Sequence, residues 1–313
     1  MATTPIPFVP PIEITYGDVT QESPLVRRVV AQNPSKYTYV GTGTYIVGHG
    51  EVAVIDPGPV LDSHRDALAA ALAGEQVRAI LVTHTHADHS PLAAWLHDET
   101  GAPRYGFGPH GEVGDALDEV DESGEPLKPE EAIDVDFVPD VALVDGATVE
   151  GPGWTFEAVH TPGHTSNHLC FSLAEERTLF TGDHVMGWST TVIAPPDGDM
   201  RAYCASLEKL LRRPSDGIYR PTHGGPITDP DPFVRAYLLH RLEREAQVLA
   251  AVRSGLVEIP AIVAVLYADV REELHKAAGR SVYAHLVKLV DDGAVTVTDG
   301  GPPKLDSVYA PTG

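Results

Sequence analysis

Apolar and turn-forming residues alternate along the first part of the chain in the pattern of an α/β protein. Residues 77–82 are almost continuously apolar and predict a short buried strand, whereas residues 154–159 alternate between apolar and polar side chains and predict a second. Shorter apolar runs at 179–182 and 218–221 predict two more strands, each with glycine at or just after its end. Glycine leaves the backbone room to turn sharply there.

The pattern changes after Pro230–Pro232, which we take as the boundary between a domain of residues 1–232 and a domain of residues 233–313. Apolar residues beyond this point recur at helical spacing. The predicted elements are helices at 233–254, 260–268 and 270–291, the last broken or bent near Gly279–Arg280, and a hairpin at 294–309. Three helices and a hairpin resemble a small winged-helix module.

The composition of the 313 residues fits a large domain with a small one beside it. No apolar run reaches the 18 or so residues of a membrane span, so we expect no membrane partner. The stretch Met1–Pro11 has neither a basic region nor a long apolar region, and we therefore expect a cytoplasmic protein. Cys170 and Cys204 belong to no motif and are expected to be buried small hydrophobes.

The net charge of −23 is unevenly distributed. Residues 112–150 hold fourteen acidic residues against one basic residue, Lys128, so residues 111–140 are predicted to form an acidic surface loop or a lid. If this loop faced a site, it would repel polyanions. Residues 241–313 carry eight basic and ten acidic residues, which disfavours nucleic acid as a partner because phosphate contacts need Lys and Arg.

The candidate chemistry begins in the residues after the first predicted strand. His84, His86, Asp88 and His89 place three imidazoles and one carboxylate within six residues, where an open α/β sheet carries its site. Imidazole and carboxylate are ligands that Zn²⁺ prefers, and four of them so close together exceed what one tetrahedral ion takes locally. The motif therefore predicts two metal ions side by side.

Three further ligand-type residues occur in matching contexts. His164, Asp183 and His223 each follow an apolar run and lie beside small or turn-forming residues. Four strand ends that converge would supply five imidazoles and two carboxylates. This set is enough for two metal ions that share a water molecule and a bridging carboxylate.

The motifs HTHADH, TPGHT, FTGD and PTHG, in this order, closely resemble those of the metallo-β-lactamase-fold hydrolases. The resemblance implies an αββα sandwich and a dinuclear site, with Asp183 bridging the two ions. It assigns the first metal to His84, His86 and His164, and the second to Asp88, His89 and His223. Asp56 would support the site from outside the ligands, although a plain turn-forming Asp before Pro57 fits as well. Thr222 departs from the pattern, because Gly or Ala is more usual before the last histidine.

Two adjacent ions would hold a bridging hydroxide at neutral pH and polarise the bond that is cleaved. Asp88 would orient the hydroxide and collect its proton. The ligand set suits Zn²⁺, and Mn²⁺ or Fe are alternatives. We find no serine or cysteine nucleophile with a convincing context, so the metals are expected to carry the hydrolysis.

Several other side chains are weaker candidates. His184, Trp188 and Tyr203 lie in the stretch after Asp183 and are candidate pocket residues, with core packing favoured for Trp188 and Tyr203. A surface or packing role is favoured for His168 over one in the outer layer of the site. The histidines without motif context are expected to be ordinary: His64, His97, His110, His160, His240, His275 and His285.

We interpret the chain as a dinuclear metal hydrolase acting on a small ester, thioester or lactone, with a homodimer as a candidate assembly. The C-terminal module resembles that of the β-lactamase-like protein 2 group, which includes a single-strand endoribonuclease, so RNA cleavage is the alternative. β-Lactam hydrolysis is a third hypothesis, as a side activity only. The common dizinc β-lactamases carry Cys where this chain has Asp183.

Overall fold

Two β-sheets form the centre of the large domain in the computed structural model, which describes residues 4–111, 132–268 and 275–312. Among these residues, the first sheet has seven strands in the order β1-β2-β3-β4-β5-β6-β7 and the second has five in the order β12-β11-β10-β9-β8. The strands of the first sheet are β1 (Val19–Gln21), β2 (Val26–Val30), β3 (Gly43–His49), β4 (Glu51–Ile55), β5 (Gln76–Leu81), β6 (Arg104–Gly106) and β7 (Val141–Ala142). Those of the second are β8 (Thr148–Gly151), β9 (Trp154–His160), β10 (Leu169–Leu173), β11 (Thr178–Gly182) and β12 (Ile218–Pro221).

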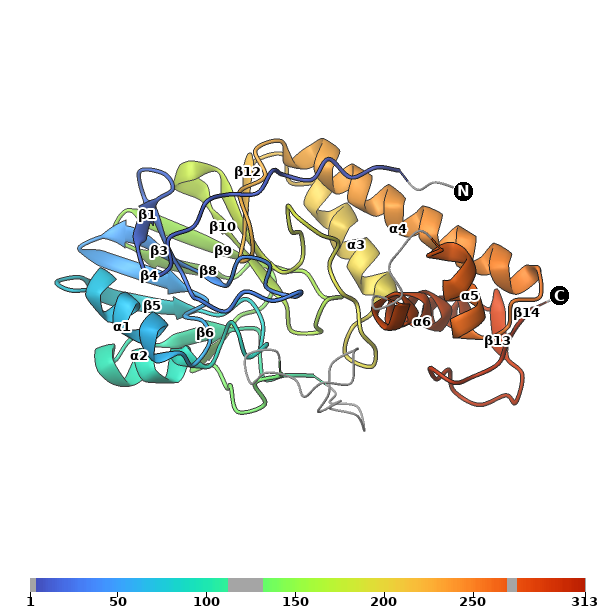
Figure 1. Ribbon diagram of the computed structural model, residues 1–313. Helices are drawn as coiled ribbons and strands as arrows, with labels where there is room; N and C mark the ends of the chain where they lie inside the picture. The colour runs from blue at the N-terminus through green and yellow to red at the C-terminus, as the bar shows by residue number, and fades with distance from the viewer. Residues whose placement is uncertain (1–3, 112–131, 269–274, 313) are drawn as a thin grey trace.

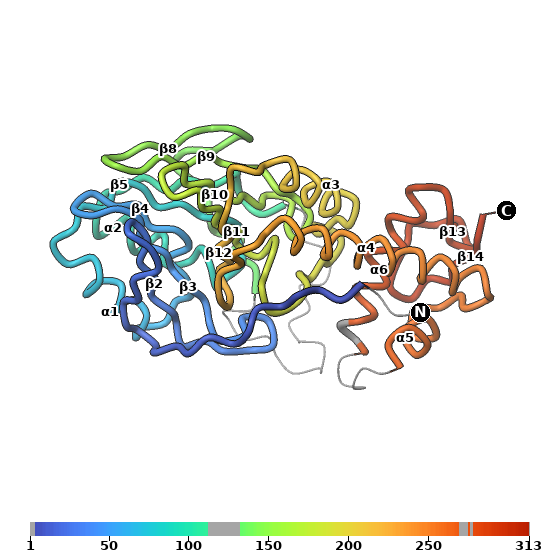
Figure 2. Tube along the Cα trace, turned by 90° about the horizontal axis from the view of Figure 1, so that it is seen from above, coloured from blue at the N-terminus to red at the C-terminus, as the bar shows by residue number. Residues whose placement is uncertain are grey.

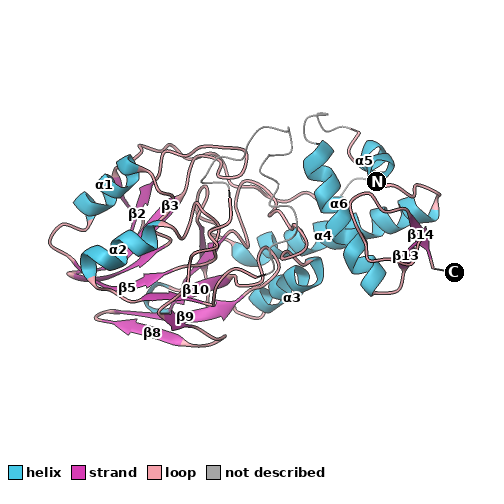
Figure 3. Ribbon diagram, turned by 90° about the horizontal axis from the view of Figure 1, so that it is seen from below, coloured by secondary structure: helices cyan, strands magenta, loops and turns pink. Residues whose placement is uncertain are grey.

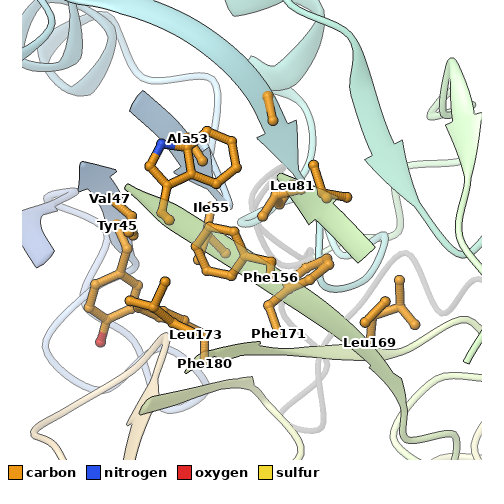
Figure 4. Packing of buried hydrophobic residues seen from close by; sticks show 14 of the residues in the cluster. Tyr45, Val47, Ala53, Ile55, Leu81, Phe156, Leu169, Phe171, Leu173 and Phe180 are labelled. Carbon is orange, nitrogen blue, oxygen red and sulfur yellow. The ribbon is translucent and has the colours of Figure 1, made fainter. Parts of the chain in front are cut away.

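The two sheets face each other across an apolar core. Figure 4 shows Tyr45, Ile55 and Leu81 of the first sheet directed toward Phe156, Phe171 and Phe180 of the second. These six side chains are at most 3% exposed, so the sheets bury one face each. The predicted strands at 77–82, 154–159, 179–182 and 218–221 are confirmed as β5, β9, β11 and β12 to within one or two residues.

Helices cover the outer faces and complete an αββα sandwich (Figure 1). On the first sheet lie α1 (Asp62–Ala71) and α2 (Leu92–Thr100), which share a core cluster with β2, β4 and β5. On the second sheet lies α3 (Met200–Leu211), whose Tyr203, Leu207 and Leu210 pack in a cluster with Val159 of β9 and Leu179 of β11. The predicted fold class is thus confirmed.

The C-terminal part is mainly helical and gathers at one end of the molecule (Figure 3). It contains α5 (Ile259–Leu266), α6 (His275–Asp291) and a hairpin of β13 (Val295–Val297) and β14 (Tyr309–Pro311). The predicted helices and hairpin are confirmed in the described residues, where α6 is continuous through Gly279 and has no break there. Residues 270–274 of the predicted third helix lie outside the described residues.

One long helix, α4 (Pro230–Arg253), belongs to both parts of the chain. Phe233 and Tyr237 in its first half pack in the cluster with α3, while Val248 and Val252 in its second half pack with α5 and α6. Figure 2 shows α4 running from the sandwich to the C-terminal helices. The predicted division after residue 232 therefore falls inside a helix that both cores share.

The predicted acidic loop lies mainly at 112–131, outside the described residues. Its described end runs beside the histidine motif, because Ala87 N donates to Ala132 O and Asp134 N donates to Thr85 O. None of the described helices is long and apolar enough to cross a membrane.

Replacing Phe233 by Ala is expected to lower the free energy of unfolding by about 3–5 kcal/mol, because Phe233 is only 2% exposed and lies where α4 covers the sandwich. Urea denaturation measures the change. The matched control is Leu239→Ala on the same helix, where the side chain is 47% exposed and the expected change is below about 0.5 kcal/mol. Equal losses of unfolding free energy in both variants would contradict the packing of α4 on the sandwich through Phe233.

Candidate metal centre

The ends of four strands bring the predicted ligands together at one edge of the sandwich. β5 leads into the His84–His89 motif, and the turn after β9 carries His164. Asp183 directly follows β11, and His223 follows β12 by two residues. At Gly182 the backbone has φ +50°, and a Cβ would lie 2.6 Å from His168 Nε2 and 2.9 Å from Thr83 Oγ1, so glycine is required before Asp183.

The first ligand group consists of His84, His86, His164 and Asp183, with one donor atom of each within 4.8 Å of the others. His84 Nε2 lies 3.0 Å from His86 Nδ1, and His164 Nε2 lies 3.2 Å from the same atom. Three imidazole nitrogens thus point at one small volume. This spacing is that of ligands around a common ion.

The second ligand group consists of Asp88, His89 and His223, all buried. Asp88 Oδ2 lies 3.2 Å from His89 Nε2 and 3.2 Å from His223 Nε2. Despite this short distance, His89 Nε2 makes no hydrogen bond within the described residues. A buried nitrogen of this kind is costly unless it binds something, and a metal ion would satisfy it.

Asp183 stands between the two groups. Its Oδ1 lies 3.3 Å from His223 Nε2 and 3.6 Å from His89 Nε2, while its Oδ2 faces His164 Nε2 at 3.9 Å. One carboxylate oxygen therefore faces each group. The position fits a carboxylate that bridges two ions.

Most of the imidazoles have their other ring nitrogen fixed by an acceptor. His164 Nδ1 lies 2.7 Å from Val192 O, and His223 Nδ1 lies 3.1 Å from Gly41 O. Because a carbonyl only accepts, both Nδ1 atoms carry a hydrogen, so Nε2 is the nitrogen whose lone pair is directed to the site once the ring is neutral. These tautomers are the ones that metal ligands need.

Asp56 is buried and collects hydrogen bonds from both sheets. Its carboxylate accepts from Thr83 N (2.8 Å), Thr83 Oγ1 (2.7 Å), Thr222 Oγ1 (3.1 Å) and His89 Nδ1 (2.9 Å). Since Thr83 Oγ1 donates to Asp56, it accepts from His84 Nδ1 at 3.0 Å, which frees His84 Nε2 for a metal. Asp56 is thus more than a turn former, and Thr222, which departs from the usual motif, supplies one of its donors.

His168 lies behind Asp183 and is fully buried. Thr161 Oγ1 lies 2.9 Å from its Nδ1, and the backbone N–H of Asp183 donates to its Nε2 at 3.3 Å. The favoured surface or packing role is therefore incomplete, because the His168 ring also accepts from the backbone of Asp183, a candidate ligand. Sequence spacing gave no sign of this contact, which depends on how the turn after β9 packs against the end of β11.

Burial and charge act differently on the two groups. Burial lowers the pKa of His86 to about 3, so this imidazole is neutral at pH 7. Burial alone would also lower the pKa of His223, but the carboxylates of Asp183 and Asp88 outweigh it and raise that pKa to about 9. The first group is thus ready to bind a cation, whereas the second must release a proton to do so.

Five of the seven candidate ligands line a cavity of about 220 Å³: His86, Asp88, His164, Asp183 and His223. Its wall includes the apolar side chains of Ile133, Met186 and Val192 together with Trp188, which stacks on Tyr39 with ring centroids 4.7 Å apart. Ile133 shows that the described end of the acidic segment contributes to this wall. A cavity of this size has room for a small substrate.

Of the three candidate pocket residues, only Trp188 lines this cavity. His184 and Tyr203 are fully buried behind it, with ring centroids 4.8 Å apart, and Tyr203 Oη donates to His184 O. His184 packs against Tyr203 of α3, and Arg241 of α4 lies over the Tyr203 ring at 5.3 Å from its centroid.

His110 and Arg280 are cavity residues that sequence reasoning missed. The Nδ1 of His110 lies 2.8 Å from Thr85 Oγ1, which also accepts from Asn167 Nδ2 at 2.9 Å. Thr85 stands between two ligands, so His110 braces the motif from its outer side. Neither residue has a local motif, and only tertiary packing brings them to the site.

The chain belongs to the metallo-β-lactamase superfamily. The superfamily profile matches residues 38–223, and that of the beta-lactamase associated winged helix domain matches residues 259–301. The fold and the resemblance seen in the motifs are confirmed by these matches. The winged-helix match covers α5, α6 and β13.

Fungal proteins are similar over most of the chain. An atrochrysone carboxyl ACP thioesterase of Aspergillus chevalieri is 32% identical over 272 residues, covering 83% of this chain and 79% of that protein. The thioesterase nsrC of Aspergillus novofumigatus is 31% identical and covers 89% of this chain and 82% of that protein. The lactamase-like protein ptaB of Pestalotiopsis fici is 30% identical, with 84% and 78% covered.

Solved structures share the fold. A beta-lactamase domain protein from Burkholderia ambifaria has a TM-score of 0.75 at 20% identity and covers 96% of this chain and 95% of its own. A metallo-beta-lactamase family protein from Thermus thermophilus has a TM-score of 0.70 at 24% identity, covering 93% and 99%. Both likenesses extend through the C-terminal part.

Asp183→Ala is expected to reduce the bound metal from about two equivalents to about one, because the substitution removes the oxygen that faces each ligand group. Elemental analysis of the purified protein measures the metal content. Asp197→Ala is the control, since Asp197 lines the same cavity but belongs to neither group. Retention of two equivalents in Asp183→Ala would show that this carboxylate does not bridge.

Metal affinity at the second group is expected to rise with pH between the ordinary histidine value of 6.5 and about 9, where His223 loses its proton. A proton and a metal ion compete for the same nitrogen, so loss of the His223 proton should strengthen binding by up to about tenfold per pH unit below its pKa and by less as pH nears 9. Competition with a chromophoric chelator measures the affinity. An affinity that does not change with pH in this interval would contradict the assignment.

Proposed function

We propose that this protein hydrolyses acyl thioesters, with two divalent metal ions held by the two ligand groups that Asp183 joins. The observation that carries the proposal is the pair of adjacent groups at one cavity, each facing one oxygen of the same carboxylate. The thioesterase names of two similar proteins favour a thioester over an ester or a lactone. The imidazole-rich ligand set favours Zn²⁺, with Mn²⁺ or Fe as alternatives.

Two bound ions would supply a hydroxide nucleophile at neutral pH and would polarise the carbonyl oxygen of the substrate. Asp88 is held in place by Thr42, whose Oγ1 donates to Asp88 Oδ2 at 2.9 Å. Its carboxylate orients the attacking oxygen and accepts the proton that this oxygen loses. The acyl carbon gains a C–O bond, its C–S bond breaks, and the thiolate leaves with the electron pair of that bond.

The wall of the cavity suits an acyl thioester. Apolar side chains such as Met186 and Val192 would surround an uncharged acyl group, and the aromatic ring of Trp188 offers a flat contact. RNA cleavage, the alternative, is less well supported because residues 241–313 carry more acidic than basic residues. The comparison with ACP thioesterases points the same way.

Purified protein of known metal content is expected to cleave a panel of acyl thioesters, and the double variant His84→Ala/His86→Ala is expected to lose at least about 10³-fold in kcat/KM, because it removes two of the three imidazoles of the first group. Release of free thiol measures the reaction. A labelled single-stranded RNA is assayed in parallel on the same preparations.

The control is His49→Ala, which changes an exposed histidine at the far end of β3 and should leave the rate unchanged. RNA cleavage that depends on His84 and His86, without thioester turnover, would replace the proposed function by the alternative. Thioester turnover that survives the double variant would remove the metals from the mechanism.

A further inference from the structure

The segment 183–192 fixes two candidate ligands of the first group. Asp183 is its first residue, and the carbonyl oxygen of Val192 at its other end accepts from His164 Nδ1 at 2.7 Å. Trp188 between them lines the cavity. The segment, which the structure describes in full, contains no helix or strand. Its shape therefore depends on hydrogen bonds from other elements.

One long side chain of α4 reaches this segment. Figure 1 shows α4 beside α3, and Arg241 of α4 is 4% exposed there. Its Nη2 donates to Thr191 O, and its guanidinium lies over the ring of Tyr203 of α3, 5.3 Å from the centroid. Its Nε has no hydrogen-bond partner among the described residues, so burial of this cation costs stability. Proteins accept such costs mainly where a side chain serves a functional site.

Thr191 connects Arg241 to both ligands. Its Oγ1 donates to Asp183 O at 2.7 Å, with His184 O 3.1 Å away. The next residue in the chain is Val192, whose carbonyl fixes the His164 ring. Arg241 thus holds the residue that lies between the anchors of the two ligands.

Tyr237, four residues before Arg241, holds the middle of the same segment. Residues at i and i+4 share a face of a helix, so both side chains leave α4 on the same side. Tyr237 is fully buried, and its Oη lies 2.7 Å from Met186 O and also contacts Ser189 O. This face of α4 therefore contacts the segment at two places.

The second ligand group is fixed by other parts of the chain. Thr42 Oγ1 donates to Asp88 Oδ2 at 2.9 Å, and His223 Nδ1 donates to Gly41 O at 3.1 Å. Gly41 and Thr42 lie directly before β3 of the first sheet. Loss of Arg241 is therefore expected to act mainly on the first group.

We propose that Arg241 is a positioning residue, which holds Asp183 and His164 for metal binding by fixing Thr191. The inference deepens the proposed hydrolysis and rests on it, because the two ligands would hold the metal that the reaction uses. The superfamily profile ends at residue 223, so the first ligand group depends on a helix outside the matched residues. Loss of a side chain that orients metal ligands typically weakens metal binding by about 10–100-fold.

The test measures the affinity of each ligand group for Zn²⁺ separately. The double variant His89→Ala/His223→Ala leaves the first group as the metal site, and His84→Ala/His86→Ala leaves the second. Arg241→Met, which keeps a long unbranched side chain and removes its donors, is added to each. Competition with a chromophoric chelator gives the dissociation constant of Zn²⁺ in all four proteins.

Arg241→Met is expected to weaken Zn²⁺ binding at least about tenfold where only the first group remains. Where only the second group remains, the loss should be no more than about threefold, because only Asp183 is affected and His164 takes no part. Equal losses in both backgrounds, or none in the first, would overturn the proposal.

Thr191→Val tests the route from Arg241 to the ligands. It removes the hydroxyl that donates to Asp183 O and keeps the carbonyl that accepts from Arg241. A loss of first-group affinity similar to that of Arg241→Met is expected, and the double variant should lose less than the product of the two single losses. Arg241→Lys, which keeps a donor, should recover part of the affinity. Single losses that multiply in full would overturn the route through Thr191.

Two controls on α4 distinguish positioning from a general loss of stability. Arg235→Met makes the same substitution where the side chain is 59% exposed. Val248→Ala removes buried side-chain volume in the core of α5 and α6 and lowers stability without touching the segment 183–192. Both should leave the first-group affinity within about twofold. A loss in Val248→Ala equal to that in Arg241→Met would overturn the positioning role.

Amide hydrogen exchange separates failure of this inference from failure of the proposed function. It is measured on the full-length protein after chelation, so the result does not depend on bound metal. Arg241→Met is expected to speed exchange at 184–192 at least about tenfold and to leave residues 43–49 of β3 within about twofold. If the wild type binds no metal, the proposed function fails, and this local increase would still support the positioning of the segment by Arg241. Unchanged exchange at 184–192 would overturn it.

Discussion

The buried carboxylate of Asp56 is the interaction on which the rest of the site depends. A carboxylate that is 1% exposed is stable only when its oxygens are fully hydrogen-bonded, and here the donors come from the ends of β5 and β12 and from His89. Asp56 itself has φ +48°, a left-handed backbone that a non-glycine residue adopts at a cost of about 1–3 kcal/mol. The hydrogen bonds offset this cost and tie both sheets together where the ligands converge.

The orientation of the ligands follows from this anchor. Because Asp56 only accepts, Thr83 must donate to it and accept from His84, and each histidine linked to it directs the remaining nitrogen toward the site. On the opposite side, His168 accepts from the backbone of Asp183. Asp183 is thus held from the second sheet, while most of the imidazoles are held from the first.

Features encoded by local sequence were predictable, and features created by packing were not. The spacing of His84, His86, Asp88 and His89 after an apolar strand places four candidate ligands close together, whatever the rest of the chain does. Helical periodicity likewise predicted the helix α4, but it did not predict that α4 packs in two separate cores. The contact of His168 with Asp183 and the cavity positions of His110 and Arg280 depend on how separate elements pack, so periodicity and residue spacing do not reveal them.

The shared helix α4 has a consequence for how this protein can change. Every proposed metal ligand precedes residue 224, whereas Arg280 in the cavity wall comes from the C-terminal part. One residue of the cavity wall therefore comes from a separate stretch of the chain, which α4 joins to the part that holds the ligands. A substitution where α4 packs against α6 would move Arg280 in the cavity wall and leave the proposed metal ligands in place. The substrate that the cavity accepts could change in this way without a change in the ligand groups.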